Sequence, residues 1–286
     1  MEKKQMKISI RPARICIYVF LILMTFICLF PILYIVLDSF KTNSEIMVGG
    51  VGLLPKVWHF ENYSKAWKLA NFSRYTYNSL YMSLFIVLGS IATATVEGYI
   101  FSRGTTKFSK IVYGMVLASL FISIGAMSLY PQLGLAKMLK LNGTLWGVIV
   151  IHVFGMNATQ AFLATSFINQ IPKELDEAAR IDGCSFARIF SSIIFPITKP
   201  LIATIGLISF RDAWSDYLLP YVFTISKPAR MPLVVGVVNL KTTGIAASSW
   251  DIALAGISIS IIPMLVVYLF LNRFFIDGLT EGAVKG

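Results

Sequence analysis

The chain has 286 residues, of which 56% are hydrophobic and 14% charged, whereas soluble domains average about 25% charged residues. This composition excludes an ordinary soluble domain. It predicts a helical integral membrane protein, because several apolar runs reach the roughly 20 residues that a helix needs to cross a bilayer. The net charge of +11 does not indicate nucleic-acid binding, since the basic residues lie at the ends of apolar runs and form no single stripe.

Six apolar segments predict an all-α membrane protein with six transmembrane helices in a single transmembrane domain, residues 1–286. The first segment follows a basic stretch, as in a signal peptide, but it is too long and lacks a small-residue cleavage site. We therefore interpret it as a retained span. The expected spans are residues 15–37, 77–101, 109–130, 145–168, 201–222 and 251–271.

Lysine and arginine are densest in three places: the N-terminal tail, the turn SRGTTKFSK, and residues 171–200. Short loops rich in these residues face the cytoplasm, so both termini are expected there. The opposite side then carries residues 38–76, 131–144 and 221–250. On that side, LPKVWHFENYSKAW mixes aromatic and charged residues, which fits either anchoring at lipid headgroups or a platform for an extracytoplasmic partner.

Residues 171–200 read IPKELDEAARIDGCSFARIFSSIIFPITKP and lie between the fourth and fifth apolar segments. Pro172 suits the first turn of a helix, and the residues after it favour helix formation. Gly183 predicts a stop or bend. A second helix is expected over residues 185–194, ended by Pro196, with Pro200 opening the next span. The segment thus predicts two short helices at an angle, outside the hydrocarbon and on the cytoplasmic side.

The order Glu177-Ala178-Ala179, Gly183 and Pro196 resembles the EAA signature of binding-protein-dependent ABC importer permeases, although Phe195 stands where that family usually has leucine. The likeness covers nearly the whole chain. It is greatest to the sugar-importer branch, and within it to the smaller membrane subunit of maltose-type importers. The stretches that carry this likeness are SFKTNSEI, ENYSKAW, RYTYNSLYMSL, SFRDAWSDYLLP and FFIDGLTEGAVKG.

The resemblance implies a type I ABC importer permease fold in a bacterial cell membrane. It also implies a homologous permease, two ATPase subunits that bind ATP and Mg, and an extracytoplasmic solute-binding protein; this chain itself would bind no cofactor. In that family the bent segment is the coupling helix, which docks on the ATPase: two alanines keep its face thin, and two carboxylates would pair with bases. The residues implied for coupling are Glu177, Ala178, Ala179, Asp182, Gly183, Pro196 and Lys285.

Related permeases use the last external loop to contact the binding protein, which implies such a role for Lys241, Thr242, Thr243, Gly244 and Trp250. The stretch LKTTGIAASSW is flexible enough for that contact, although small residues are equally ordinary in any loop.

The fifth apolar segment carries Arg211, Asp212 and Asp216 at membrane depth, where ionisable residues usually face a bundle interior. The two aspartates are four residues apart and are expected to share a helix face. They could line a sugar path together with Trp214 and Asn157. Alternatively, an Arg–Asp pair ties this helix to a neighbour. His152 and Gln160 are similar candidates, with a helix-to-helix hydrogen bond as the plainer role for His152.

A Walker A loop is missing, since GGVGLLPK does not have its spacing, and no nucleophile–base set is evident. The chain is therefore expected to be a non-catalytic subunit that moves a sugar or oligosaccharide inward, with metal and nucleic acid playing no part. An importer permease for another solute is the first alternative. An ion-coupled carrier is the second, although the chain lacks the repeated halves of many such carriers.

Overall fold

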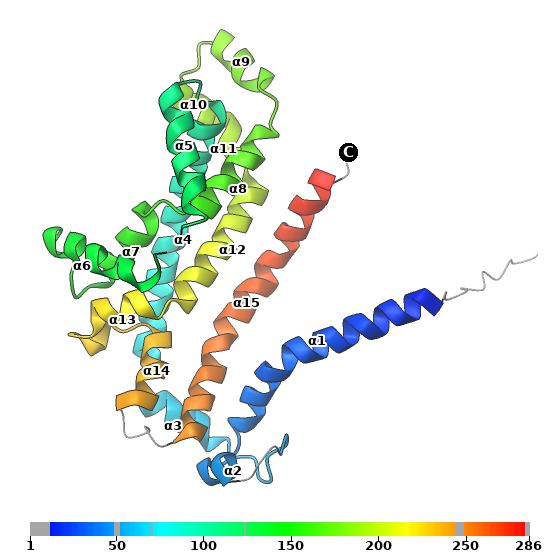
Figure 1. The fold of residues 1–286 in the computed structure, drawn as a ribbon, viewed down its shortest axis with the longest axis vertical. Helices are drawn as coiled ribbons and strands as arrows, with labels where there is room; N and C mark the ends of the chain where they lie inside the picture. The colour runs from blue at the N-terminus through cyan, green and yellow to red at the C-terminus, as the bar shows by residue number, and fades with distance from the viewer. Residues whose placement is uncertain (1–11, 49–51, 70, 123, 244–248, 284–286) are drawn as a thin grey trace, which may run out of the picture. The chain divides into compact units, whose positions relative to one another are not determined.

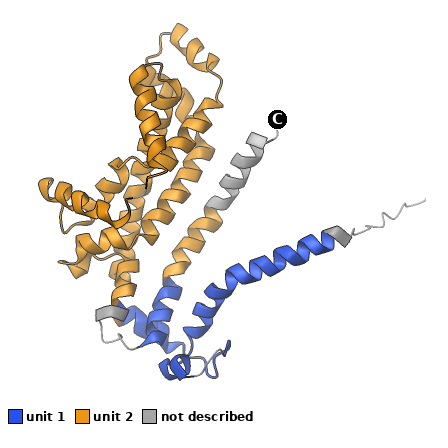
Figure 2. Cartoon of the chain, in the orientation of Figure 1, with its two compact units in different colours: residues 1–68, 240–259 blue, residues 69–239, 260–286 orange. Residues whose placement is uncertain are grey.

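The computed structural model describes residues 12–48, 52–69, 71–122, 124–243 and 249–283, and every regular element in these ranges is a helix (Figure 1). Residue contacts divide the chain into two compact units (Figure 2). Unit 1 comprises residues 1–68 and 240–259, and unit 2 comprises residues 69–239 and 260–286. The single transmembrane domain expected from the sequence stays a prediction.

Unit 1 contains three helices near the N-terminus and the beginning of the last helix. Trp250 opens that helix, and its backbone N–H donates to Asn43 Oδ1 at 2.7 Å. The helices are α1 (Pro12–Asp38), α2 (Asn43–Val48), α3 (Glu61–Leu69, whose last residue belongs to unit 2) and the first ten residues of α15 (Trp250–Ala283).

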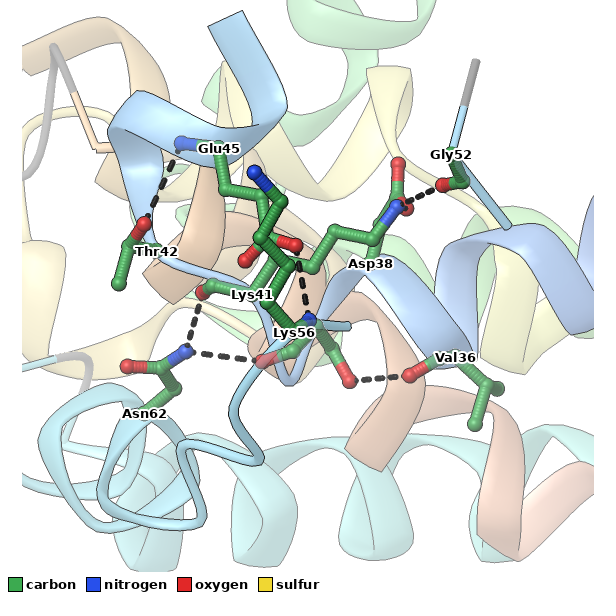
Figure 3. Close-up of polar contacts among 9 residues, drawn as sticks. Val36, Asp38, Lys41, Thr42, Glu45, Gly52, Lys56 and Asn62 are labelled. Atoms are coloured by element: carbon green, nitrogen blue, oxygen red, sulfur yellow. Dashed lines mark hydrogen bonds and ion pairs between the residues drawn. The ribbon is translucent and has the colours of Figure 1, made fainter. Parts of the chain in front are cut away.

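A buried polar cluster follows the end of α1 (Figure 3). Lys41 Nζ lies 2.6 Å from Asp38 Oδ1 and also donates to the carbonyl oxygen of Gly52. Asn62 Nδ2 donates to the carbonyl oxygens of Ser39 and Lys41 at 3.0 and 2.9 Å. These side chains are buried, and a buried charge is stable only when it is paired. The cluster therefore fixes the chain after α1 to the start of α3.

The aromatic residues of the stretch LPKVWHFENYSKAW gather beside the cluster. The ring centroids of Trp58, Phe60 and Tyr63 each lie 5.1 Å from that of Phe40. Trp58 and Phe60 remain exposed. Either headgroup anchoring or partner docking fits this exposure.

Unit 2 is built around α4 (Phe72–Arg103), which packs against α7, α8 and α12. Figure 1 shows α8 and α12 running beside α4, with α9 and α10 near one end of this bundle. Its other elements are α5 (Lys107–Ser119), η1 (Gly125–Ser128), α6 (Leu129–Met138), α7 (Leu145–Phe154), α8 (Ala158–Asn169), α9 (Glu174–Ile181), α10 (Phe186–Ile189), η2 (Phe190–Ile194), α11 (Phe195–Ile197), α12 (Lys199–Ser215), α13 (Leu218–Thr224), η3 (Pro228–Arg230), most of α14 (Leu233–Thr243) and the rest of α15.

Small residues allow α4 and α8 to approach closely, as is usual between membrane helices. A Cβ atom added to Gly98 would lie 2.5 Å from the Cβ of Ala164 and 2.8 Å from its backbone carbon. Neither atom belongs to a flexible side chain that could turn aside. A larger residue at position 98 would therefore have to separate the two helices.

Gly98→Ala is expected to lower the thermal unfolding midpoint of the purified chain, because overpacking costs about 1–3 kcal/mol. Gly114→Ala is the matched control, since Gly114 lies in α5 with nothing within 4 Å of the added Cβ. That substitution should stabilise the helix by roughly 0.5–1 kcal/mol. Thermal unfolding in detergent measures both, and shifts of the same sign would contradict the packing argument.

Three described helices are long and apolar enough to cross a membrane: Arg14–Asp38, Phe72–Arg103 and Trp250–Phe270. Two bent pairs pass the same test as broken spans, Leu145–Phe154 with Ala158–Asn169 at 43° and Phe186–Ile197 with Lys199–Ser215 at 80°. The protein is thus a multi-pass membrane protein with several apolar helices, although six straight spans are not found among the described residues.

Three predicted spans differ in the structure. Residues 109–130 are not one helix, because α5 ends at Ser119 and Gly125 takes the left-handed φ of 56°. Residues 145–168 break after Phe154, and residues 201–222 break after Ser215. At Asp216 the backbone is extended, with ψ 121°. The sequence predicted the apolar character of these segments, but it did not predict the places where the backbone leaves the helical conformation.

Candidate functional site

The bent segment begins with α9, as the sequence predicted after Pro172. Three acidic residues, Glu174, Asp176 and Glu177, occupy the first turn, and Arg180 occupies the last. This placement favours the helix, since carboxylates stabilise the positive N-terminal end of its dipole and cations the opposite end. The charged composition of α9 therefore supports its helical structure.

Gly183 ends α9 with a left-handed turn at φ 78°. The N–H of Gly183 donates to Arg180 O at 3.0 Å, and the N–H of Cys184 donates to Ala179 O at 2.9 Å. This pair of bonds is the Schellman motif, in which glycine is preferred because other residues resist positive φ. The predicted stop at Gly183 is confirmed.

The second arm runs from Phe186 to Ile197 and contains a π-helical turn over Phe190–Ile194. Its predicted end at Pro196 is wrong. Pro196 lies inside α11, and the 80° bend to α12 comes at Thr198. A proline nitrogen cannot donate, and the wider turn just before it accommodates the missing bond. Pro200 does lie in the first turn of α12, as predicted.

A buried ionic clamp holds α9 to the end of α4. Arg103 Nε lies 3.0 Å from Asp176 Oδ2, with both side chains at most 5% exposed. Tyr99 Oη donates to Asp176 Oδ1 at 3.0 Å, and Arg103 Nη2 donates to the carbonyl oxygen of Ile171 at 2.9 Å. This Tyr99–Arg103–Asp176 clamp places the turn after α4 and the bent segment at the same end of unit 2, consistent with the shared side predicted from their charges.

The two faces of α9 differ sharply. Ala179 is buried with Tyr99 and Ile189 in the protein's own core, so it does not help to thin an outer face, which corrects the role predicted for it. The predicted coupling residues Glu177, Ala178, Asp182 and Gly183 are exposed. Ile181 is also 87% exposed, an apolar side chain that no described residue covers. Lys285 lies outside the described residues.

Sequence reasoning singled out the exposed acids of α9 and missed the residues of the clamp as functional candidates. Tyr99 and Arg103 are separated from Asp176 by more than seventy positions, and no local pattern joins them. One signal was available: Asp176 and Ala179 are three residues apart and therefore share a helix face. That face turns inward.

Only some of the predicted path residues come together: Asn157 and Asp216 line one hollow with His152, whereas Arg211, Asp212 and Trp214 lie elsewhere. Arg211 and Asp212, neighbours on α12, pair with each other at 2.7 Å, so among the described residues this pair joins no two helices. Trp214 is buried, and its Nε1 donates to Ser260 O of α15 at 3.1 Å. Trp214 therefore packs between α12 and α15 and does not line the hollow beside Asp216. Gln160 of α8 also bonds a neighbouring helix, since its Nε2 donates to Ser209 Oγ of α12 at 3.0 Å.

Asp216 and His152 come together at two helix breaks. His152 Nε2 lies 3.0 Å from Asp216 Oδ2. The spacing of four residues had predicted that Asp212 and Asp216 share a helix face. This prediction is wrong, because Asp216 follows the last residue of α12 and lies outside the helix. Asn157 caps α8 by accepting from the backbone N–H groups of Thr159 and Gln160.

The predicted binding-protein contacts lie mostly where side chains are not described. Lys241, Thr242 and Thr243 form the end of α14, and Gly244 is outside the described residues. Of the stretch LKTTGIAASSW, which was expected to be flexible, residues 240–243 belong to α14 and residues 244–248 lie outside the described residues. Trp250 is 41% exposed at the start of α15.

These features define a helical multi-pass membrane protein whose bent, charged segment projects an outer face. The family model of the binding-protein-dependent transport system inner membrane component matches residues 7–276, and the chain belongs to this family. It is a non-catalytic permease subunit of an ABC importer, and ATP hydrolysis takes place on a separate chain.

Individual relatives match over almost their whole length. The galactooligosaccharides transport system permease protein GanQ of Bacillus subtilis is 30% identical over 94% of each chain. The arabinooligosaccharides transport system permease protein AraQ of Halalkalibacterium halodurans is 32% identical over 91% of this chain and 92% of its own. A bacterial ABC transporter involved in alginate import shares the fold, with a TM-score of 0.78, 22% identity, and coverage of 96% of this chain and 100% of that one.

Proposed function

We propose that the substrate of this permease is a sugar or oligosaccharide, delivered by an extracytoplasmic binding protein and released into the cytoplasm. Support comes from the two relatives of about 30% identity, both permeases for oligosaccharides, which align over more than nine-tenths of the chain. The polar side chains at the breaks near Asp216 suit hydroxyl groups better than they suit an apolar solute.

The observation that carries the coupling mechanism is the two-faced α9. Its outer face presents Glu177 and Ala178 with the uncovered Ile181, a combination suited to a groove with a basic rim. Its inner face is held by Asp176 and Ala179. A push from the ATPase on the outer face would therefore pass through rigid contacts to α4, and through α10 and α11 to α12.

The working assembly comprises this chain, a homologous permease and two ATPase subunits that bind ATP and Mg. Both termini and the bent segment face the cytoplasm of a bacterial cell, in keeping with the lysines and arginines after α4. Glu177 and Asp182 would pair with bases of the ATPase, and Lys285 would contact it. Residues 241–244 and Trp250 would face the binding protein, and Asn157 and Asp216 would lie along the sugar path.

Vesicle uptake tests this proposal. The assay uses proteoliposomes that contain ATP inside, with the binding protein and labelled oligosaccharide added outside. Uptake should require internal ATP and persist when an uncoupler dissipates the ion gradients. Uptake that stops with the uncoupler while ATP is still present would instead indicate an ion-coupled carrier, and uptake of oligopeptide or phosphate alone would reject the sugar substrate.

A further inference from the structure

Two helix breaks of unit 2 meet at one cavity. The first separates α7 from α8 and contains Met156 at the left-handed φ of 47°. The second separates α12 from α13 at Asp216. Broken backbone within a membrane protein persists where it is buried in protein or lines a cavity, because its N–H and C=O groups need partners. Two such breaks around one space indicate a built feature.

The cavity is an open hollow with a volume of about 380 Å³. Small-molecule sites have volumes of roughly 300–1,000 Å³, with mostly apolar walls and a few convergent polar groups. Its polar side chains include Gln132, His152, Asn157 and Asp216, and its apolar walls include Leu129 and Leu218. None of the described lining residues is a lysine or an arginine.

Several polar groups remain available to a ligand. Asn157 Oδ1 caps α8, whereas its Nδ2 makes no hydrogen bond within the described part of the chain. The amide of Gln132 likewise has no protein partner among the residues described. Asp216 accepts from His152 and, at 3.4 Å, from the N–H of Leu219, which leaves unused lone pairs on its carboxylate. The cavity thus offers both donors and acceptors.

We propose that this cavity is a subsite, within this subunit, for one ring of a neutral oligosaccharide. Hydroxyl groups donate to Asp216, and the amides of Gln132 and Asn157 bind the remaining hydroxyls. An acidic sugar is disfavoured, because its carboxylate would face Asp216 with no lysine or arginine on the wall. The inference rests on the proposed sugar-importing function and adds the place of binding and the charge of the ring.

Direct binding to the assembled transporter tests the subsite. The permease pair with its ATPases is purified in detergent without the binding protein, and equilibrium dialysis measures labelled maltodextrin, galactooligosaccharide and arabinooligosaccharide trisaccharides. Gln132→Ala should weaken binding about three- to tenfold, the effect of one lost hydrogen bond. Asp216→Asn should also weaken it. Gln170→Ala is the matched control: this glutamine ends α8, outside the cavity, and its loss should change nothing.

An alginate trisaccharide, which is acidic, should not displace the neutral probe. The subsite is rejected if all three neutral probes fail to bind, if Gln132→Ala and Gln170→Ala behave alike, or if the acidic trisaccharide competes equally. ATP-dependent uptake in the same preparation reports the proposed function separately. Normal oligosaccharide uptake combined with any of these results rejects only the subsite.

Discussion

Asp176→Asn is expected to reduce oligosaccharide uptake by about tenfold or more while the protein still reaches the membrane. Removing one partner of a buried ion pair costs roughly 3–5 kcal/mol, because the other charge remains buried. Here that charge is Arg103, which is 4% exposed. The side-chain oxygen of the asparagine can still accept the hydrogen bond from Tyr99 Oη, so the expected cost lies near the lower end of this range. Each 1.4 kcal/mol is about tenfold in a population, so the loss should show both in uptake and in ATPase stimulation by the loaded binding protein.

Two further variants separate the clamp from a general effect of charge on α9. Glu174→Gln removes an exposed carboxylate two residues away and should leave uptake unchanged. The double variant Arg103→Met with Asp176→Leu removes both charges, and replacing a whole buried pair by apolar residues is often neutral or stabilising. It should therefore recover much of the lost uptake. Equal uptake in Asp176→Asn and the wild type would show that the clamp does not position the segment.

The helical membrane class and the bent segment were predictable from the sequence because their signals are local. Long apolar runs exclude a soluble fold, and the glycine at 183 marks the end of a charged helix. A left-handed turn needs only a few consecutive residues, so its signature stands in one short stretch. The identity of the family was also readable, since its signature extends no further than from Glu177 to Pro196.

The inward and outward faces of the site were harder to predict, since they depend on contacts between distant residues. Asp176 looked equivalent to Glu174 and Glu177 in the sequence, yet only Asp176 faces Arg103. The breaks at Met156 and Asp216 were hidden for a related reason. Apolar composition reports where a chain prefers to lie, but it carries little information on where the backbone leaves helical geometry.

Gly183→Pro is expected to abolish uptake while leaving the chain in the membrane, because it disrupts the turn in two ways. Proline fixes φ near −65°, whereas Gly183 has φ 78°. Proline also lacks the N–H that donates to Arg180 O. A penalty of about 3 kcal/mol lowers the population of the native turn about 100-fold. The outer face of α9 and the arm that leads to α12 would then no longer keep their angle.

Gly183→Asn and Gly183→Ala test intermediate degrees of this backbone effect. A Cβ at this position would meet nothing within 4 Å, so both substitutions change only the backbone preference and cause no clash. Asparagine tolerates left-handed angles and should retain most uptake, whereas alanine should lose more, in line with a cost of roughly 1–2 kcal/mol. The expected order is glycine, asparagine, alanine, proline in uptake and in ATPase stimulation, with equal amounts of protein in the membrane. Normal uptake and normal stimulation in Gly183→Pro would mean that the angle between α9 and α10 is not what transmits the motion.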